Sequence, residues 1–219
     1  MSAPELPNIV ITGGRGGLAA AIAARFAQGE WQVDAPGRDV LDVTSPASVA
    51  GYFSRHSPTL LVCNAGLTRD APLGRISPDD WQRVFDVNYH GAHRCARAVL
   101  PGMLRRACGH IVFISSHSAL HPPAGQAGYA AAKAAVVGLA QALALEAGAD
   151  GVRVNVILPG FLETPMTTGV SAERKAAVLG DHALGRFNTP ECVAGFIWHL
   201  HHELPHTSGQ VFQLDSRRG

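Results

Sequence analysis

The sequence predicts an α/β protein built on one doubly wound parallel sheet that is shortened between its second and third strands. Short runs rich in β-branched residues alternate with longer alanine-rich stretches, which is typical of parallel strands covered by helices on both faces. A glycine-rich turn joins the first predicted strand to the first helix. The chain has 219 residues, of which 47% are hydrophobic, so one sizeable core can form without disulfides or metals.

The first half of the chain begins with a strand at residues 8–12, which hold the apolar run Ile9-Val10-Ile11. An alanine-rich helix at 17–27 follows directly after the glycines. Two further short apolar runs, at 31–35 and 59–63, are predicted as strands.

A long helix is predicted to begin after Ser77 and to run to about Arg106. Ser77 is a good N-cap, Pro78 fits the first turn, and the two aspartates that follow face the positive end of the helix dipole. The Pro101-Gly102 pair predicts a break near the end of this helix, since proline cannot donate a backbone hydrogen bond.

The second half of the chain continues the alternation of strands and helices. Strands are predicted at 109–115, 152–158 and 210–214, and a long helix at 126–147. Thr189-Pro190-Glu191 has the pattern of a further helix start.

Composition and charge narrow the class of partner. The formal net charge of +1 argues against nucleic acid or a membrane surface bound through bulk charge. No run of 18 apolar residues occurs, the first apolar run is too short for a signal peptide, and the four cysteines form no CxxC pair. We therefore expect one domain, residues 1–219, in the cytoplasm, with no membrane or nucleic-acid partner.

The turn after the first strand contains Gly13, Gly16 and Gly17 and opens into a helix at Leu18. Glycines there allow a tight turn and let the backbone approach a pyrophosphate, whose charge the helix N-terminus favours. Two glycine registers fit, and both place Ala19 where a third glycine is often found. An ordinary strand-to-helix loop is the alternative.

A set of motifs further along the chain is more specific. They are Asn64-Ala65-Gly66, Asn88, Ser115-Ser116, Tyr129-Ala-Ala-Ala-Lys133, Pro159-Gly160 and Thr164. In this order and spacing, the set resembles the short-chain dehydrogenase/reductase family over nearly the whole chain. The resemblance implies a Rossmann-type fold, a nicotinamide cofactor, and an oxidoreductase.

The proposed catalytic residues are Asn88, Ser116, Tyr129 and Lys133. Tyr129 and Lys133 stand at i and i+4 of one helix, so the ammonium can lie near the phenol and lower its pKa. Tyr129 is then the general acid in carbonyl reduction, and Ser116 stabilises the substrate oxygen. Ser115 is the near alternative to Ser116. The resemblance implies that Asn88 anchors a water connected to Lys133; a satisfied core amide is the alternative.

The resemblance also implies the cofactor contacts. Lys133 holds the nicotinamide ribose, Thr164 and the backbone near Leu162 hold the carboxamide, and Asp42 lies beside the adenine. The full predicted set is Gly13, Arg15, Gly16, Gly17, Leu18, Arg38, Asp42, Val43, Asn64, Ala65, Gly66, Tyr129, Lys133, Pro159, Gly160, Leu162 and Thr164.

NADP(H) is the predicted cofactor, because Arg38 and Arg15 can hold its 2′-phosphate. The position that selects NAD by an acidic side chain falls on Gly37. Asp34 and Asp39 lie close enough in the chain that NAD(H) stays open as the alternative.

One departure from the family pattern concerns the segment between the second strand and the expected Asp42-Val43-Thr44 strand. Only residues 37–41 separate them, and a parallel crossover needs about a dozen. We expect the usual intervening helix to be missing and the adenosine pocket to be more open.

The substrate is predicted to be a ketone that becomes a secondary alcohol. Residues 64–70, 184–186 and 189–191 are similar to the β-ketoacyl-ACP and acetoacetyl-CoA reductase branch, which favours a 3-oxoacyl thioester carried by CoA or a carrier protein. Residues 160–190 form the expected substrate-side segment. The candidate substrate contacts, each of which could also serve only for packing, are His117, Gln126, Phe161 and Met166.

The run His199-Leu200-His201-His202-Glu203 places His199 and Glu203 on one helical face. No further ligands accompany it at suitable spacing, so we predict no metal site and expect a helix surface or a subunit contact.

Two other functions are carried beside the reductase: a non-catalytic dinucleotide sensor and a sugar-nucleotide epimerase or dehydratase. The family resemblance implies a homodimer or homotetramer.

Overall fold

The structure is a computed structural model that describes residues 6–217, and its centre is a six-stranded parallel sheet in the order β2-β1-β3-β4-β5-β6. The strands are β1 (Asn8–Ile11), β2 (Gln32–Asp34), β3 (Leu60–Cys63), β4 (Gly109–Ile114), β5 (Val152–Leu158) and β6 (Val211–Gln213). The chain passes from β1 to β2 on one side and then returns to β3 on the other, so the sheet is doubly wound. This confirms the predicted fold class.

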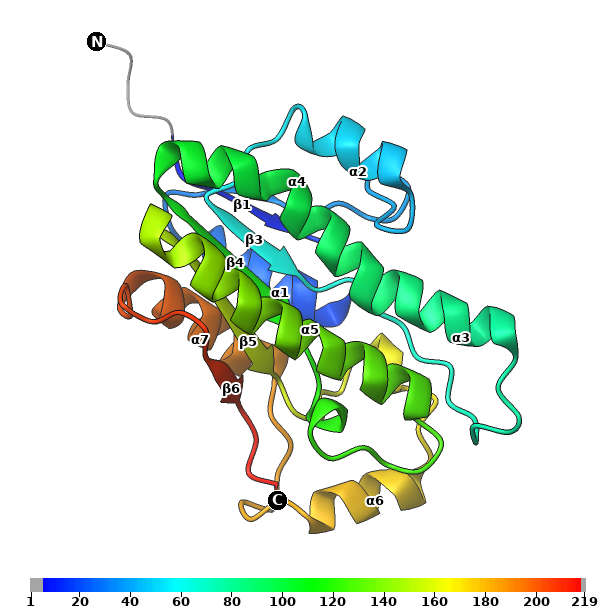
Figure 1. Cartoon of the computed structure of the whole chain (residues 1–219). Helices are drawn as coiled ribbons and strands as arrows, with labels where there is room; N and C mark the ends of the chain where they lie inside the picture. Colours follow the sequence, from blue (N-terminus) through cyan, green and yellow to red (C-terminus); the bar gives the residue numbers. More distant parts are fainter. Residues whose placement is uncertain (1–5, 218–219) are drawn as a thin grey trace.

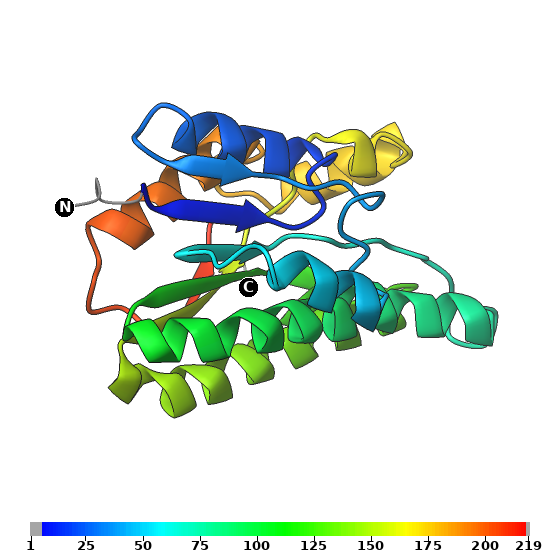
Figure 2. The same ribbon diagram turned by 90° about the horizontal axis from the view of Figure 1, so that it is seen from above.

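Helices cover both faces of the sheet, as Figures 1 and 2 show. One face carries α1 (Gly17–Phe26) and α7 (Pro190–His202); the other carries α2 (Pro46–Phe53), α4 (Gly91–Arg106) and α5 (Ala127–Ala147). The remaining helical elements are α3 (Pro78–Phe85), η1 (Asp86–His90), η2 (His117–Ala119), η3 (Gly148–Asp150), η4 (Pro165–Thr167) and α6 (Ala172–Gly180).

The side-chain alternation of the strands divides the core into two layers. Ile9 and Ile11 pack with Phe26 beneath α1 and α7, whereas Val10 packs with Met103 beneath α2, α4 and α5. All residues of β3 and β4 are buried, as expected for central parallel strands. The sheet is therefore a rigid support for the loops that follow its strands.

Two predicted helix starts are confirmed by their caps. The Ser77 hydroxyl accepts a hydrogen bond from the Asp80 amide at 3.1 Å, and the Thr189 hydroxyl accepts one from the Cys192 amide at 3.2 Å. Each bond satisfies one backbone donor of the first turn, which helices otherwise leave unpaired.

The predicted break near Pro101 is wrong. Helix α4 continues through Pro101 to Arg106, because the buried residues Val99 and Met103 hold it against the sheet on either side of the proline. The helix is irregular instead at Asp86–His90, where the π-helical turn η1 joins α3 to α4 without a break.

The expected strand at Asp42-Val43-Thr44 is also wrong. The Asp42 carboxylate accepts hydrogen bonds from the Thr44 amide at 2.9 Å and from its hydroxyl at 2.7 Å, which closes a local turn. Ser45 then caps α2. Residues 35–44 thus replace both the usual helix and the usual strand, and the sheet is shortened as predicted.

Helix α5, with the turn η3 that follows it, is long and apolar enough to cross a membrane by length and composition alone. In the fold it lies along one face of the sheet and buries Val136, Ala140 and Leu143 in the core (Figure 1). The cytoplasmic location and the oligomeric state stay predictions.

Candidate active site

A cavity of about 890 Å³ opens at the carboxyl ends of β1, β3, β4 and β5. Its walls are the loops that follow these strands, together with the first turns of α1 and α5 and part of α6. The strand order reverses between β1 and β3, and open parallel sheets bind their ligands at such a point.

The glycine turn forms one end of this cavity. Gly13 has φ +72°, and a Cβ there would lie 2.9 Å from the Cα of Ala65, so both conformation and space favour glycine. Gly16 is the N-cap of α1 and makes no side-chain capping bond, and a Cβ on Gly17 would lie 3.2 Å from Thr164. The first amides of α1 are therefore accessible to an anion, as a pyrophosphate site requires.

Thr12 fixes the loop that carries Asn64 and Ala65. Its hydroxyl accepts hydrogen bonds from both backbone amides at 3.0 Å, and its carbonyl accepts one from the Asn64 side chain at 3.1 Å. The loops after β1 and β3 are thereby joined, and the cavity floor between them is continuous.

Asn88 lies in η1 and is almost fully buried. Its amide nitrogen donates to the carbonyls of Leu67 and Val84, both at 2.8 Å, which leaves Oδ1 buried without a partner among the residues described. A Cβ on Gly66 would lie 2.9 Å from this oxygen and 3.6 Å from Lys133 Nζ, so the two atoms approach the same point. The Asn88 oxygen is available for a hydrogen bond beside the lysine.

Lys133 is 4% exposed, and its Nζ donates to the Ile114 carbonyl at 2.8 Å. Burial lowers the pKa of Lys133 to about 8, although the nearby Cys63 thiol acts in the opposite direction. Nζ lies 5.8 Å from the centre of the Tyr129 ring. The i, i+4 spacing on α5 thus brings the ammonium and the phenol to one side of the helix, as predicted.

The pKa of Tyr129 differs from expectation. Burial raises it, a hydrogen bond with Ser116 lowers it, and the carboxylate of Asp70 raises it. Lys133 was expected to lower this pKa, but its Nζ donates to the Ile114 carbonyl and lies 5.8 Å from the centre of the Tyr129 ring. The raised pKa of Tyr129 favours the protonated phenol at neutral pH.

Ser116 and Ser115 have distinct surroundings. The Ser116 hydroxyl lines the cavity beside Tyr129 and accepts a hydrogen bond from the Ser118 amide at 3.2 Å. Ser115 is buried, and its hydroxyl donates to the Lys133 carbonyl at 2.9 Å. Ser115 therefore braces α5, and Ser116 is the serine available to a ligand.

Two ion pairs lie around the connection that follows β2. Arg38 Nε lies 3.0 Å from Asp42, and Arg15 lies 2.8 Å from Asp39. Burial opposes ionisation of Asp42, but hydrogen bonds from Thr44 and Arg38 outweigh it and lower its pKa. Arg38, Asp42 and Val43 line the cavity, whereas the Arg15 side chain does not.

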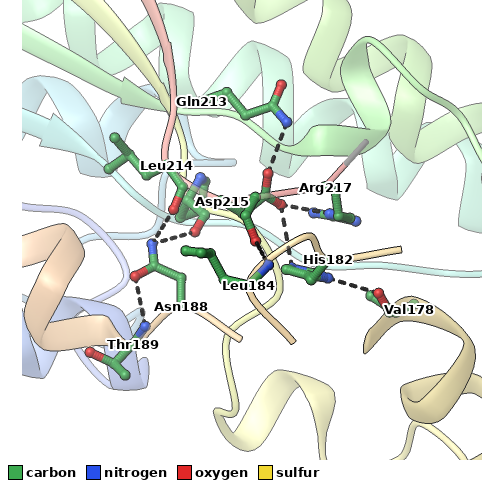
Figure 3. A network of polar contacts seen from close by, with 11 residues as sticks. Val178, His182, Leu184, Asn188, Thr189, Gln213, Leu214, Asp215 and Arg217 are labelled. Atoms are coloured by element: carbon green, nitrogen blue, oxygen red, sulfur yellow. Dashed lines mark hydrogen bonds and ion pairs between the residues drawn. The ribbon is translucent and has the colours of Figure 1, made fainter. Parts of the chain in front are cut away.

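The loop after β5 is supported from behind by the last strand. Gly160 has φ +85°, and a Cβ there would lie 2.6 Å from the Cβ of Asp215. The Asn188 side chain donates to the carbonyls of Pro159, at 2.9 Å, and Leu214, at 2.7 Å (Figure 3). Thr164 caps the short turn η4.

Most of the predicted cofactor residues line this one cavity. Those on its wall are Gly13, Gly16, Gly17, Leu18, Arg38, Asp42, Val43, Asn64, Ala65, Gly66, Tyr129, Lys133, Pro159, Gly160, Leu162 and Thr164. Their contacts with a cofactor stay predictions.

Of the four predicted substrate contacts, Gln126, Phe161 and Met166 line the cavity. The His117 side chain does not; it stacks on His121, and its Nε2 is buried without a partner among the residues described.

The cavity-lining residues that sequence reasoning missed include Arg174 and Val178 of α6, and Arg217. The capping serine at Ser171 was the available signal for α6. No sequence pattern marked Arg217, which reaches the cavity only because the chain turns back after β6.

The histidine run of α7 takes part in aromatic packing. His201 stacks with His110, and His202 stacks on Trp198. Within residues 6–217, no group of three His, Cys, Asp or Glu side chains is arranged to hold a metal. The absence of a metal stays a prediction.

Comparison with known proteins identifies the family. Residues 42–175 match the family model for short chain dehydrogenases, which is more than half of the chain. The chain belongs to the short-chain dehydrogenase family. The match begins at Asp42, near the end of the shortened connection. This short-chain dehydrogenase is therefore an NAD(P)-dependent oxidoreductase, as predicted, and the result favours an enzyme over a non-catalytic sensor.

Curated relatives of this short-chain dehydrogenase include two 3-oxoacyl-[acyl-carrier-protein] reductases. The FabG protein of Salmonella typhimurium is 36% identical over 163 residues, which cover 72% of this chain and 67% of the relative. The Synechocystis enzyme is 38% identical over 202 residues, 91% of this chain and 76% of the relative.

A solved structure supports the same fold assignment. A putative NAD(P)-dependent gluconate 5-dehydrogenase from Beutenbergia cavernae, with bound NADP at low occupancy, is 30% identical to this short-chain dehydrogenase. The TM-score is 0.90, and the match covers 96% of this chain and 95% of the other.

Proposed function

We propose that this protein is an NADPH-dependent ketoreductase that converts a ketone, with 3-oxoacyl thioesters as the leading class, to a secondary alcohol. One observation carries the proposal: the open amides of α1 and the group Ser116, Tyr129 and Lys133 share the wall of one cavity. Its volume of about 890 Å³ lies within the range of cofactor and substrate sites.

The cavity fits a dinucleotide. A Cβ on Gly13, Gly17 or Gly66 would lie within 3.2 Å of Ala65, Thr164 or Asn88, so glycine lets the loops that line the cavity pack closely, and the N-terminus of α1 can hold the pyrophosphate. Lys133 would hold the nicotinamide ribose, and Thr164 with the backbone at Leu162 would hold the carboxamide. When bound, the reduced nicotinamide supplies a hydride to the carbonyl carbon of the substrate.

NADPH is preferred over NADH in this proposal because of the charges around the adenosine end. Arg38 lines the cavity and can hold a 2′-phosphate. The two acids that kept NAD(H) open are otherwise engaged: Asp34 accepts a hydrogen bond from the Tyr52 hydroxyl, and Asp39 pairs with Arg15. The NADP in the structural relative supports the same choice.

Tyr129 donates the proton that the reduction needs. Its raised pKa keeps the phenol protonated at neutral pH, and Ser116 shares a hydrogen bond with it, so both hydroxyl groups can meet one substrate oxygen. As the negative charge develops on that oxygen, Ser116 stabilises it and the phenol gives up its proton.

Lys133 and Asn88 restore the proton. The Lys133 ammonium favours the phenolate that remains once the phenol has given up its proton. The unpartnered Oδ1 of Asn88, which approaches the same point as Lys133 Nζ, is the acceptor that would order a water beside the lysine. Proton exchange with solvent then passes along α5 and η1.

The test is NADPH oxidation with 3-oxoacyl thioesters and simple ketones, with NADH in parallel. In Tyr129→Phe, turnover should fall by about 10²–10⁴-fold while NADPH binding, measured by fluorescence, is kept. Tyr89→Phe, a tyrosine of η1, is the matched control and should keep turnover. Undiminished turnover in Tyr129→Phe would overturn the mechanism, and NADPH binding without turnover of any substrate would favour the sensor. Conversion of a sugar nucleotide without net NADPH consumption would favour the epimerase.

A further inference from the structure

The segment after β6 turns back toward the cavity and carries a buried ion pair (Figure 3). The Asp215 side chain is 0% exposed. Its two oxygens accept hydrogen bonds from different residues: Oδ1 from Gln213 Nε2 at 2.8 Å, and Oδ2 from Arg217 Nε at 2.6 Å. The carboxylate therefore lies behind the guanidinium, out of reach of a ligand in the cavity.

The backbone that leads into Arg217 is also fixed. The Ser216 carbonyl accepts a hydrogen bond from the Ala183 amide at 2.8 Å, and its hydroxyl accepts one from the Leu184 amide at 3.2 Å. His182 and Arg217 form an isolated antiparallel bridge. The guanidinium is thus held by its own side chain and by its backbone, so little side-chain entropy is lost when it binds a ligand.

His182 contributes to the same arrangement. Its Nδ1 lies 2.7 Å from the Val178 carbonyl, and its Nε2 lies 3.9 Å from Asp215 Oδ2 (Figure 3). His182 therefore lies between the end of α6 and Asp215, so the part of the cavity wall formed by α6 is close to Arg217.

Two nitrogen donors of Arg217, Nη1 and Nη2, are not used by Asp215. Arg217 lines the cavity with a side chain only 14% exposed, and Nη1 and Nη2 have no hydrogen-bond partner within residues 6–217. Burial lowers the pKa of His117, the residue after Ser116, and the positive charge of Arg217 lowers it further. Arg217 and Ser116 therefore line the same cavity.

We propose that Arg217, held in place by Asp215, binds an anionic oxygen group on the ketone substrate. Two donors in one plane match the two oxygens of a carboxylate or of a phosphate. The carboxylate of a free oxo acid and the phosphate of a CoA or carrier-protein thioester share this chemistry. The inference rests on the proposed ketoreductase function, because it assigns part of that substrate.

The first experiment measures binding, so that it does not depend on turnover. Acetoacetate and acetoacetamide have nearly the same size and differ in charge, and each is titrated calorimetrically into the complex of the protein with NADP⁺. If the carboxylate is the ligand, the native protein should bind acetoacetate about tenfold to a hundredfold more tightly than the amide. Arg217→Gln should remove this preference, and Arg217→Lys should keep only part of it, because lysine has no planar fork.

The second arm tests the phosphate source. Acetoacetyl-CoA is compared with acetoacetyl-N-acetylcysteamine, a thioester without phosphate, in the same complex and variants. Arg186→Gln is the matched control for charge, because Arg186 is exposed and lies outside the cavity wall. It should leave both preferences within about twofold of the native values, and thermal unfolding should show that each variant is folded.

The outcomes separate this inference from the proposed function. If the native protein prefers the anionic ligand of one pair and Arg217→Gln loses that preference, the inference is supported, and the pair identifies the anion as a carboxylate or a phosphate. A preference absent from both pairs in the native protein, or unchanged in Arg217→Gln, overturns it. If the preference depends on Arg217 but no ketone is reduced, the anion site stands and the ketoreductase function fails.

Discussion

Replacing Lys133 by methionine should abolish turnover and raise the stability of the folded protein. Lys133 is 4% exposed, and burial lowers its pKa from the usual 10.5 to about 8. This change corresponds to about 3 kcal/mol of folding free energy that the native protein loses at neutral pH. Methionine has a similar length and no charge to desolvate.

The expected net gain is smaller than this figure. The variant loses the hydrogen bond from Nζ to the Ile114 carbonyl and leaves that carbonyl unpaired, which costs about 1 kcal/mol. We therefore expect Lys133→Met to be more stable by about 2 kcal/mol at pH 7, or about 4–8 °C in Tm for a chain of this size.

The pH dependence distinguishes desolvation from better packing. Between the folded pKa of about 8 and the unfolded value of 10.5, the unfolded native chain binds more protons than the folded one, so native stability rises with pH. The advantage of Lys133→Met should accordingly shrink by about 2 kcal/mol between pH 7 and about pH 9.5, measured by urea unfolding.

The other lysine of the chain provides the control. Lys175 is partly exposed and lies 3.7 Å from Glu163, so Lys175→Met should change stability by less than about 1 kcal/mol, with little pH dependence. If Lys133→Met is no more stable than the native protein, or if its advantage is the same at both pH values, the ammonium is not desolvated in the folded state and the argument is refuted.

Two further predictions concern the cofactor. Gly13→Ala should weaken NADPH binding at least about tenfold and destabilise the fold by about 1–3 kcal/mol, because φ at residue 13 is +72° and the new Cβ would lie 2.9 Å from Ala65. An NADPH affinity that is unchanged in a fluorescence titration would contradict this prediction. Arg38→Gln should raise the KM for NADPH about tenfold and leave that for NADH within about twofold, since only the former carries the 2′-phosphate; equal losses for both would remove Arg38 from cofactor selection.

The sequence predicted those parts of the site whose geometry is local. Tyr129 and Lys133 share one side of α5 because they stand one helical turn apart, and the glycine turn follows from Gly13 and Gly17 at the end of a strand. The central strands β1, β3, β4 and β5 were predictable for the same reason, since each is a short segment rich in buried apolar residues.

Features set by long-range contacts were not predictable in this way. Helix α4 passes Pro101 because buried neighbours hold it, and the Asp42 carboxylate closes a turn where a strand was expected. The pKa of Tyr129 depends on burial, which the spacing of Tyr129 and Lys133 does not report. Arg217 meets Ser116 in one cavity only after the chain has completed the sheet.

The π-helical turn η1 also affects how the chain tolerates changes in length. A π-turn holds one residue more than an α-helical turn, so deleting one residue within Asp86–His90 would let α3 and α4 join as one regular helix. Because the π-turn takes up that residue within one turn, its deletion would leave α3 and α4 in nearly the same orientation, but it would shift the side chains of the turn around the helix axis and turn Asn88 away from Lys133. The segment can therefore accept a change in length without unfolding, but only at the expense of the proton path.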